Sequence, residues 1–331
     1  MKAMILAAGL GTRLRPLTDT RPKALVEING RTLLEITITR LAHFGVTEFI
    51  INVHHLADQV ASYLQSKNNF GYRIELSRED DQLLDTGGGL RKAAWFFLEN
   101  VSTLEQASPQ KPSAPTRHSP LATRHLPSEP FFLHNVDLIS NIDLAAMLQF
   151  HNQQEALVTL AVQSRDSARQ LLFNNNLQLA GRRINTHDEL VNPDPQSSAI
   201  PQISVIPESS VILSEAKNPA AIASQPTTDE TPQVSAHSPL ATRHSPLLQP
   251  KESSSLLPLA FSGIHVISAR LLSQLTESTP VFSIIDSYLR LSSQGEKILA
   301  FRHDHSYWRD LGKPTDLAQA ALDLQRNNLP S

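Results

Sequence analysis

The chain has 331 residues, a formal charge of -3 and no cysteine. This length allows one large or two modest globular domains, and the charge balance argues against a general nucleic-acid binder, which needs an excess of positive charge. Disulfides and thiolate metal sites are excluded, and no apolar run approaches the roughly 20 residues of a membrane span. The short apolar start is followed directly by charged residues, so we expect a first strand rather than a signal peptide, and a cytoplasmic protein without a membrane partner.

The first hundred residues alternate between strand-like and helix-like periods. Leu34, Ile38 and Leu41 repeat at helical spacing, and three glycines open the last helix of this part. Such alternation predicts a parallel sheet with helices on both faces, where ligands sit at the carboxyl ends of the strands. The predicted strands are 2–7, 47–53 and 72–77, and the predicted helices are 32–44, 56–67 and 88–98.

Two segments break this pattern, residues 101–129 and residues 185–257. The octapeptide HSPLATRH occurs once in each of them, at 118–125 and 237–244. A pair of similar disordered linkers is one explanation, but two identical octapeptides favour a repeated genetic element inserted into an older gene. We therefore predict a single domain over 1–331, with a disordered insertion at 101–129 and a largely disordered one at 185–257.

Ordered texture returns between and after these segments. The apolar runs predict further strands, a hairpin and helices, and the last helix carries apolar residues on one face. The predicted strands are 130–137, 155–163, 258–267 and 297–302, the hairpin is 170–181, and the helices lie at about 141–152, about 281–291 and around Leu317, Ala321 and Leu324.

The segment LAAGLGTRLRPLTDTRPKAL, residues 6–25, combines glycines with a cluster of cations. A dinucleotide fingerprint needs a third glycine where Leu14 stands, and a P-loop needs Lys and Ser/Thr where Thr12 and Arg13 stand. An ordinary turn would explain the glycines but not the cations. Glycines let backbone N–H groups approach phosphate oxygens, and cations neutralise charge on a leaving pyrophosphate. The segment therefore predicts a nucleoside triphosphate as ligand.

This segment resembles the signature of the sugar-1-phosphate nucleotidyltransferases, with Gly-x-Gly-Thr-Arg, then Pro-Leu-Thr, then Pro-Lys. The resemblance continues through LLDTGGGLRKA, FFLHNVDLISNIDL, AFSGIHVIS and YWRDLGKPTDLAQA, and so covers nearly everything outside the two broken segments. It is strongest to short bacterial proteins that are mannose-1-phosphate guanylyltransferase-like or N-acetylmuramate-1-phosphate uridylyltransferase-like. It implies a Rossmann-like α/β fold with a mixed, mostly parallel sheet and helices on both faces.

The resemblance also implies roles for individual residues. Arg13 and Lys23 would act on the phosphates, and Asp137 and Asp310 would hold Mg²⁺, because two carboxylates with phosphate oxygens and water suit this hard cation. The alternatives are a solvated loop lysine for Lys23 and a helix N-terminal aspartate for Asp137. The implied nucleotide-binding residues are Ala8, Gly9, Gly11, Thr12, Glu79, Gly87 and Gly88.

The acceptor side has weaker signals. The resemblance places Arg165, Arg169 and Gly263 near the sugar phosphate, but the Glu-Lys-Pro motif of many relatives is missing. His303 and His305 flank Asp304, and without a third distant ligand we expect a polar turn there.

The implied reaction joins a nucleoside triphosphate to a sugar 1-phosphate and releases pyrophosphate. The alternatives are a glycosyltransferase that consumes a nucleotide sugar, and a nucleotide-sugar-sensing relative that has lost catalysis. The sequence leaves the base, the sugar and the oligomeric state open.

Overall fold

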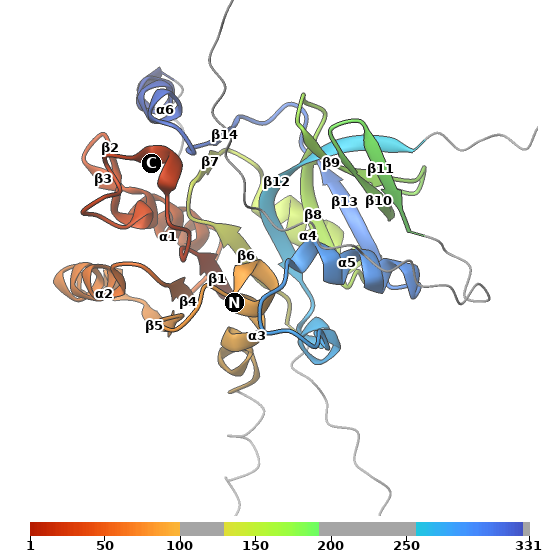
Figure 1. Cartoon of the computed structure of the whole chain (residues 1–331), viewed down its shortest axis with the longest axis horizontal. Helices are drawn as coiled ribbons and strands as arrows, with labels where there is room; N and C mark the ends of the chain where they lie inside the picture. The colour runs from red at the N-terminus through yellow and green to blue at the C-terminus, as the bar shows by residue number, and fades with distance from the viewer. Residues whose placement is uncertain (100–128, 192–255, 327–331) are drawn as a thin grey trace, which may run out of the picture. The chain divides into compact units, whose positions relative to one another are not determined.

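The computed structural model describes residues 1–99, 129–191 and 256–326 (Figure 1). The two predicted insertions therefore lie mostly outside the described residues. In chain order the elements are β1 (Lys2–Leu6), β2 (Glu27–Ile28), β3 (Arg31–Thr32), α1 (Leu33–His43), β4 (Glu48–Val53), α2 (Ala57–Ser66), β5 (Arg73–Arg78), α3 (Asp85–Leu98), β6 (Phe131–Asn135), β7 (Leu138–Ser140), α4 (Leu144–Gln154), β8 (Val158–Gln163), β9 (Arg169–Phe173), β10 (Leu179–Ile184), β11 (His187–Leu190), β12 (Leu257–Ile267), α5 (Ile284–Ser293), β13 (Ile298–Arg302), β14 (Trp308–Asp310) and α6 (Pro314–Arg326).

The main sheet of the described residues has ten strands and two halves of different character. In the first half, β6, β1, β4 and β5 are neighbours in that order and parallel. In the second half, β12 runs antiparallel to β6, β8 and β9, and β9, β10 and β11 continue antiparallel to the far edge. Figure 1 shows β5 and β11 at opposite ends of this arrangement. The predicted mixed α/β fold is confirmed.

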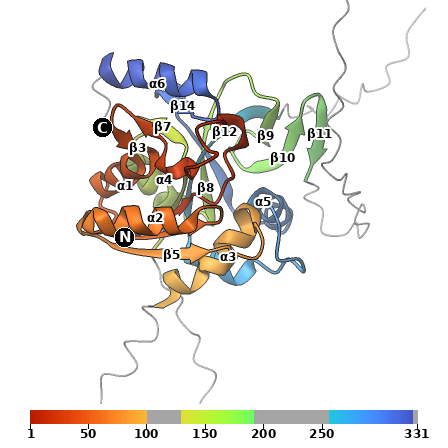
Figure 2. The ribbon, with the colours of Figure 1, turned by 60° about the vertical axis from the view of Figure 1, so that its left-hand side comes forward.

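Helices cover both faces of the sheet, as the alternating apolar residues of β1 require. Ala3 and Ile5 face one core layer, which packs against α1, α2, α4 and α6, while Met4 faces the other, which packs against α3 and α5. Successive side chains of a strand point to opposite faces, so one apolar strand serves both layers. Figure 2 shows α3 next to α5, and the two helices are in contact. Among the described residues, no helix combines the length and the apolar character needed to cross a bilayer.

The structure corrects two predicted boundaries. β11, at His187–Leu190, lies inside the range 185–257 that the sequence assigns to the second insertion, and it pairs with β10. Its residues are all exposed, so it lacks the apolar alternation by which strands are recognised. Helix α3 begins at Asp85, three residues before the predicted start at 88, and the three glycines lie in its first turns.

Candidate active site

A cavity of about 410 Å³ lies at the carboxyl ends of the parallel strands, where the sequence predicts a ligand. The loop after β1, the ends of β4 and β6, the residue that follows β5 and the start of α3 meet around it. Of the predicted site residues, Ala8, Gly9, Lys23, Glu79 and Asp137 line this cavity. The other lining residues are Leu6, Ala7, Asn52, Leu83, Asp85, Thr86, Asn135, Val136 and Val281.

The loop after β1 folds back on itself at Gly11. This residue has φ +64°, and a Cβ there would lie 2.9 Å from the Thr18 methyl carbon and 3.2 Å from Cβ of Lys23. The Thr18 hydroxyl also donates a hydrogen bond to the Gly11 carbonyl, at 2.8 Å. Only glycine fits this left-handed, crowded position easily. Gly11 does not line the cavity. Its turn allows the chain to pass close to Lys23, which does.

Lys23 forms an ion pair with Asp137, through a hydrogen bond from its ammonium group to Oδ2. Their side chains are only 11% and 21% exposed, so water screens the pair weakly. Lys23 comes from the loop after β1 and Asp137 follows β6, the parallel neighbour of β1. The structure thus brings together two residues that the sequence assigns to the phosphates and to the metal.

Asp310 reaches the same place through a small two-stranded sheet. β14 pairs with β7 so that Asp310 lies opposite Leu138, and the Leu311 N–H donates to the Asp137 carbonyl at 2.9 Å. Burial and the neighbouring Asp137 carboxylate raise the pKa of Asp310, while Lys23 and Arg13 oppose the rise. Its Oδ1 atom is buried without a hydrogen-bond partner.

An unsatisfied buried carboxylate oxygen beside a second carboxylate fits a hard divalent cation. Among the described residues, no group of three or more His, Cys, Asp or Glu side chains could hold a metal ion. The predicted role of Asp137 and Asp310 as cation ligands stays a prediction.

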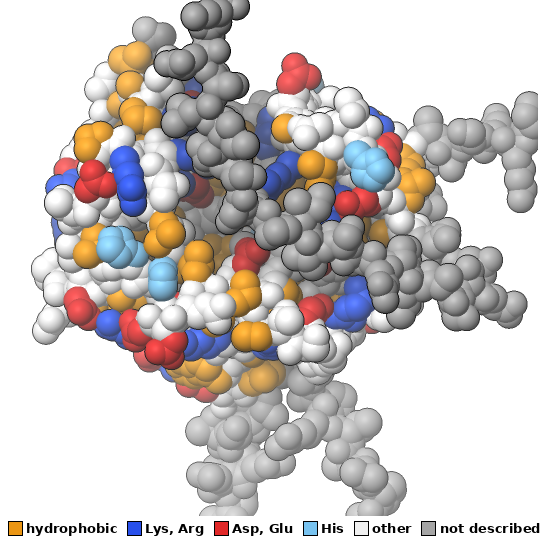
Figure 3. Space-filling view, in the orientation of Figure 1, with side chains coloured by type: hydrophobic (Ala, Val, Ile, Leu, Met, Phe, Trp, Pro, Cys, Tyr) orange, Lys and Arg blue, Asp and Glu red, His pale blue; other side chains and the backbone are white. Residues whose placement is uncertain are grey.

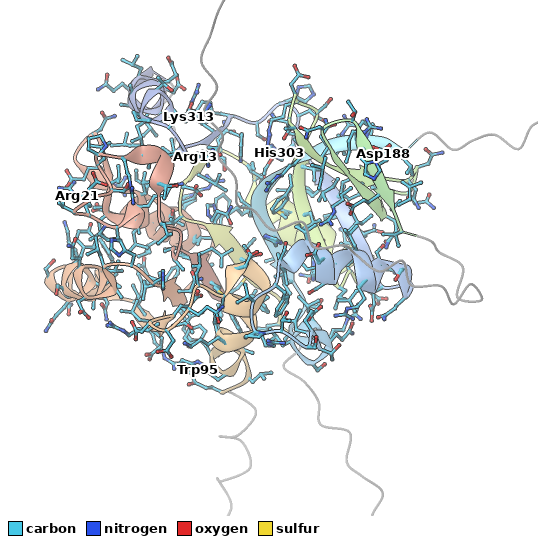
Figure 4. All side chains as sticks on the ribbon, in the orientation of Figure 1. Arg13, Arg21, Trp95, Asp188, His303 and Lys313 are labelled. Atoms are coloured by element: carbon cyan, nitrogen blue, oxygen red, sulfur yellow. The ribbon has the colours of Figure 1, made fainter. Side chains whose placement is uncertain are left out.

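Arg13 lies at the edge of this site. A Cβ on Gly312 would come within 2.7 Å of its guanidinium group, so the glycine after β14 makes room for it. Figure 4 shows Arg13 near Lys313, and it shows Arg21 at the left-hand edge of the view. Arg21 instead pairs with Glu27 at 3.5 Å. The cation cluster of the sequence is thus divided, with Arg13 and Lys23 at the site and Arg21 away from it.

Glu79 is buried and holds the cavity wall together. Its Oε1 accepts a hydrogen bond from Asn52 at 2.8 Å, and its Oε2 accepts one from the Leu84 N–H at 2.9 Å. Asn52 in turn accepts a hydrogen bond from the Ala7 N–H at 2.8 Å. This chain ties β1, β4 and α3 together. Sequence reasoning missed Asn52, although a lone amide near the end of an apolar strand signals a buried polar contact.

Gly87 and Gly88 lie behind the cavity wall. Their N–H groups donate to the Phe282 carbonyl at 3.0 and 3.3 Å. A Cβ on Gly87 would lie 2.3 Å from the Phe282 ring, and one on Gly88 would lie 2.2 Å from the Pro280 carbonyl oxygen. The segment before α5 needs glycines in order to pack here, and it places Val281 in the cavity lining. The structure thus gives these glycines a packing role, and their contact with a base stays a prediction.

The predicted acceptor residues lie apart from one another. The Arg165 guanidinium stacks on Trp308, 3.8 Å from the ring centroid, and donates to the Phe261 carbonyl at 2.6 Å. Burial lowers the pKa of Arg165, and the Asp310 carboxylate opposes this change. Arg169 lines a second cavity, of about 290 Å³, which also contacts Phe261 and the start of α5.

Gly263 forms part of an irregularity in β12, where the pairing with β8 shifts register. It has φ +74°, and a Cβ would lie 2.5 Å from Leu138 and 3.0 Å from the Asn135 amide. Glycine is required because a bulge brings β12 close to β7 and to the cavity residue Asn135. Close approach of a sugar at this position stays a prediction.

The predicted polar turn at His303 is confirmed. The His303 ring is hydrogen-bonded to the Ser262 hydroxyl at 2.8 Å, and the Asp304 carboxylate accepts from the Ser164 N–H at 2.7 Å.

On the face drawn in Figure 3, the described lysine and arginine side chains are interspersed with acidic ones and form no continuous basic surface.

Parts of this chain are similar in sequence to known proteins. Residues 2–107 match the family model described as nucleotidyl transferase. The N-acetylmuramate alpha-1-phosphate uridylyltransferase of Caulobacter vibrioides is 48% identical over 110 residues, which is 31% of this chain and 46% of that protein. The enzyme of the same name from Neisseria meningitidis is 35% identical over 149 residues, 45% of this chain and 52% of that protein. A mannose-1-phosphate guanyltransferase beta-B of Xenopus laevis is 31% identical over 163 residues, 49% of this chain and 38% of that protein. The matched part thus spans about half or less of these relatives.

Solved structures share the fold over nearly the whole chain. The inositol-1-phosphate CTP transferase from T. maritima has a TM-score of 0.57 at 15% identity and covers 98% of this chain and 96% of its own. A UDP-glucose pyrophosphorylase complexed with UDP-glucose has a TM-score of 0.59 at 14% identity and covers 98% of both chains. The family model and the relatives confirm the resemblance to sugar-1-phosphate nucleotidyltransferases that the motifs predict, and the structures confirm the fold.

Proposed function

We propose that this chain transfers a nucleotidyl group from a nucleoside triphosphate to a sugar 1-phosphate. One observation carries the proposal: Lys23 and Asp137 form an ion pair in the lining of the 410 Å³ cavity, beside the glycine loop, and Asp310 lies next to Asp137. Lys23, two carboxylates and the backbone of a glycine loop suit the phosphates of a nucleotide and a metal cation bound with them.

The proposed reaction would use this arrangement. A phosphate oxygen of the sugar 1-phosphate attacks the α-phosphorus in line, a new P–O bond forms, and the bond to the pyrophosphate breaks. No general base is needed, because the attacking phosphate is already ionised. Ala8 and Gly9 bring the loop backbone to the phosphates, Lys23 and Arg13 neutralise their charge, and Asp137 and Asp310 would hold Mg²⁺. When bound, Mg²⁺ would neutralise charge on the phosphate oxygens.

The base would lie against α3. Leu83 and Val281 both line the cavity and are each 36% exposed, which provides apolar surface for a flat ring. Both oxygens of the Glu79 carboxylate are engaged, by Asn52 and by the Leu84 N–H. Glu79 therefore supports the wall of the base site.

The acceptor would occupy the side of β12. Arg165, which follows β8, stacks on Trp308, and Arg169 lines the 290 Å³ cavity. Arginine suits a phosphate because its planar group can donate two hydrogen bonds at once. The relatives favour two substrate pairs, UTP with N-acetylmuramate 1-phosphate, which we place first, and GTP with mannose 1-phosphate.

Pyrophosphate release from a matrix of triphosphates and sugar 1-phosphates tests this function. The expected result is release that requires both substrates and a divalent cation, with UTP and N-acetylmuramate 1-phosphate the best pair. Asp137→Asn serves as the inactive control. A glycosyltransferase would instead release a nucleoside diphosphate from a nucleotide sugar. A sensing relative would bind the nucleotide sugar without any turnover, and either result would refute the proposal.

A further inference from the structure

The side chain of Lys23 occupies a position that its proposed role does not require. A lysine that only awaits phosphates would extend into the cavity, yet its ammonium group is bonded to Asp137. The Lys23 side chain is 11% exposed and that of Asp137 is 21% exposed. A hydrogen-bonded pair between two charges with so little contact with water is much stronger than an exposed pair.

Around the Lys23–Asp137 ion pair, acidic groups outnumber the cations that contact them. Asp310 lies beside Asp137, and its buried Oδ1 has no hydrogen-bond partner. Arg13 acts on Asp310 through space, but no ion pair joins Arg13 to any acidic group of the described residues. Lys23 is therefore the cation that directly neutralises the two-aspartate site.

The backbone of Lys23 is held while its side chain can move. Lys23 begins a short 3-10 turn in which the next residue, Ala24, is completely buried. The flexible four-carbon stem of a lysine can redirect its ammonium group without moving that backbone. Lys23 also lines the cavity, so phosphates bound there would lie within its range.

We propose that Lys23 is an exchangeable occupant of the cation site. In the nucleotide-free protein it neutralises Asp137 in place of a divalent cation, and it leaves Asp137 for the phosphates when the cation and triphosphate bind together. This inference rests on the proposed function for the positions of the cation and the phosphates. It adds that Lys23 opposes cation binding in the absence of nucleotide and favours it in its presence.

Linkage requires this coupling to be reciprocal. Lys23 bonded to Asp137 blocks the cation site. The apparent affinity for the cation is therefore the intrinsic affinity multiplied by the fraction of molecules in which the site is free. A triphosphate that draws Lys23 away raises that fraction, and the cation in turn strengthens triphosphate binding by the same factor. The cation and the triphosphate would therefore bind cooperatively, and the cation alone would bind weakly.

Mn²⁺ binding to the nucleotide-free protein, followed by electron paramagnetic resonance, tests the exchange without any turnover. Lys23→Met should bind Mn²⁺ roughly tenfold more tightly than wild type, since the competing occupant is gone. Arg13→Met removes a neighbouring cation that does not contact Asp137, and it should change the affinity less than threefold. Asp137→Asn should lose the site. Equal or weaker binding by Lys23→Met, an equal gain in Arg13→Met, or unchanged binding by Asp137→Asn would overturn the proposal.

A non-hydrolysable UTP or GTP analogue gives a second measurement. It should raise the Mn²⁺ affinity of wild type by a larger factor than that of Lys23→Met, because only wild type has an occupant to displace. An equal factor in both proteins would overturn the exchange. The increase in thermal midpoint on adding Mn²⁺ should also be larger for Lys23→Met, which shows in the same experiment that the variant is folded.

The outcomes separate the two proposals. Tighter Mn²⁺ binding by Lys23→Met together with no pyrophosphate release from any substrate pair would support the exchange and refute the proposed function. An active wild type whose Lys23→Met variant gains no Mn²⁺ affinity would do the reverse.

Discussion

The 410 Å³ and 290 Å³ cavities differ in how the charges at each of them are compensated. Next to the 410 Å³ cavity, Asp310 has a buried oxygen without a hydrogen-bond partner, and Lys23, which lines the cavity, forms its ion pair with Asp137. At the 290 Å³ cavity, arginines and acidic residues pair with each other, and of the arginines that line it only Arg169 forms no ion pair with the described residues. Incomplete compensation marks the place where a ligand must supply charge. The first cavity therefore depends on its ligands far more than the second.

The largest expected effect comes from removing charge at the first cavity. Asp137→Asn and Asp310→Asn should each lower turnover roughly 10³-fold at saturating Mg²⁺, because the shared cation loses a ligand and with it several kcal/mol of charge stabilisation. Steady-state pyrophosphate release measures this, and circular dichroism checks that the fold is intact. Near wild-type turnover in either variant would show that Asp137 and Asp310 do not share a catalytic cation.

Gly263 tests the bulge that brings the two halves together. Gly263→Ala should lower the free energy of unfolding by roughly 3 kcal/mol, from the strained positive φ plus the clash with Leu138. Gly295 has a similar φ of +87° but nothing within 4 Å of an added Cβ, so Gly295→Ala should cost only about 1 kcal/mol. Urea unfolding of both variants separates the two causes, and equal losses would mean that contact with Leu138 is unimportant.

Buried histidines within and near β6 and β12 make the fold acid-sensitive. Burial lowers the pKa of His134 and His151 to about 4 and that of His265 to about 3. Below the unfolded pKa, about 6.5, the unfolded chain binds protons that the folded chain excludes, so stability is complete above that pH and falls as the pH drops towards 4. The free energy of unfolding should be roughly 2 kcal/mol lower at pH 6 than at pH 7.5. Urea titrations at both pH values measure it, and a flat profile would contradict the burial of neutral rings.

The smallest expected effect lies at the second cavity. Arg169→Ala should raise the KM for the sugar 1-phosphate roughly tenfold and leave the KM for the triphosphate unchanged, because only the acceptor loses a charged hydrogen bond. Arg183, which lines the same cavity but is paired with Asp188, provides the matched control, and Arg183→Ala should change either KM less than twofold. If Arg183→Ala had the larger effect, pairing would not distinguish the two cavities.

Local patterns predicted most of the fold. The period of Leu34, Ile38 and Leu41 located α1, and the apolar run after Met1 located β1. β7 and β14 escaped prediction because each has three residues and is defined only by pairing with the other. That pairing places Asp310 beside Asp137, so the motifs named both residues while only the three-dimensional structure explains how they meet.

Glycines were harder to interpret than charges. Gly87 and Gly88 suggested a binding loop, yet they lie in α3 and accommodate Phe282 and Pro280 from a distant segment. A missing side chain gives the same sequence signal whether a ligand or another part of the chain fills the space. Asn52 escaped notice because its hydrogen-bond partner Glu79 follows a different strand, β5, and the sequence alone does not show that the two meet.

The pairing of β14 with β7 has a consequence for the newly made protein. Lys23 and Asp137 emerge from the ribosome long before Asp310, which the chain supplies only after β13. A nascent chain that has folded its parallel strands therefore has the lysine and one carboxylate, and these can neutralise each other while the last ligand is still awaited. The pairing of β14 with β7, once β14 has left the ribosome, then brings the second aspartate of the proposed cation site into place.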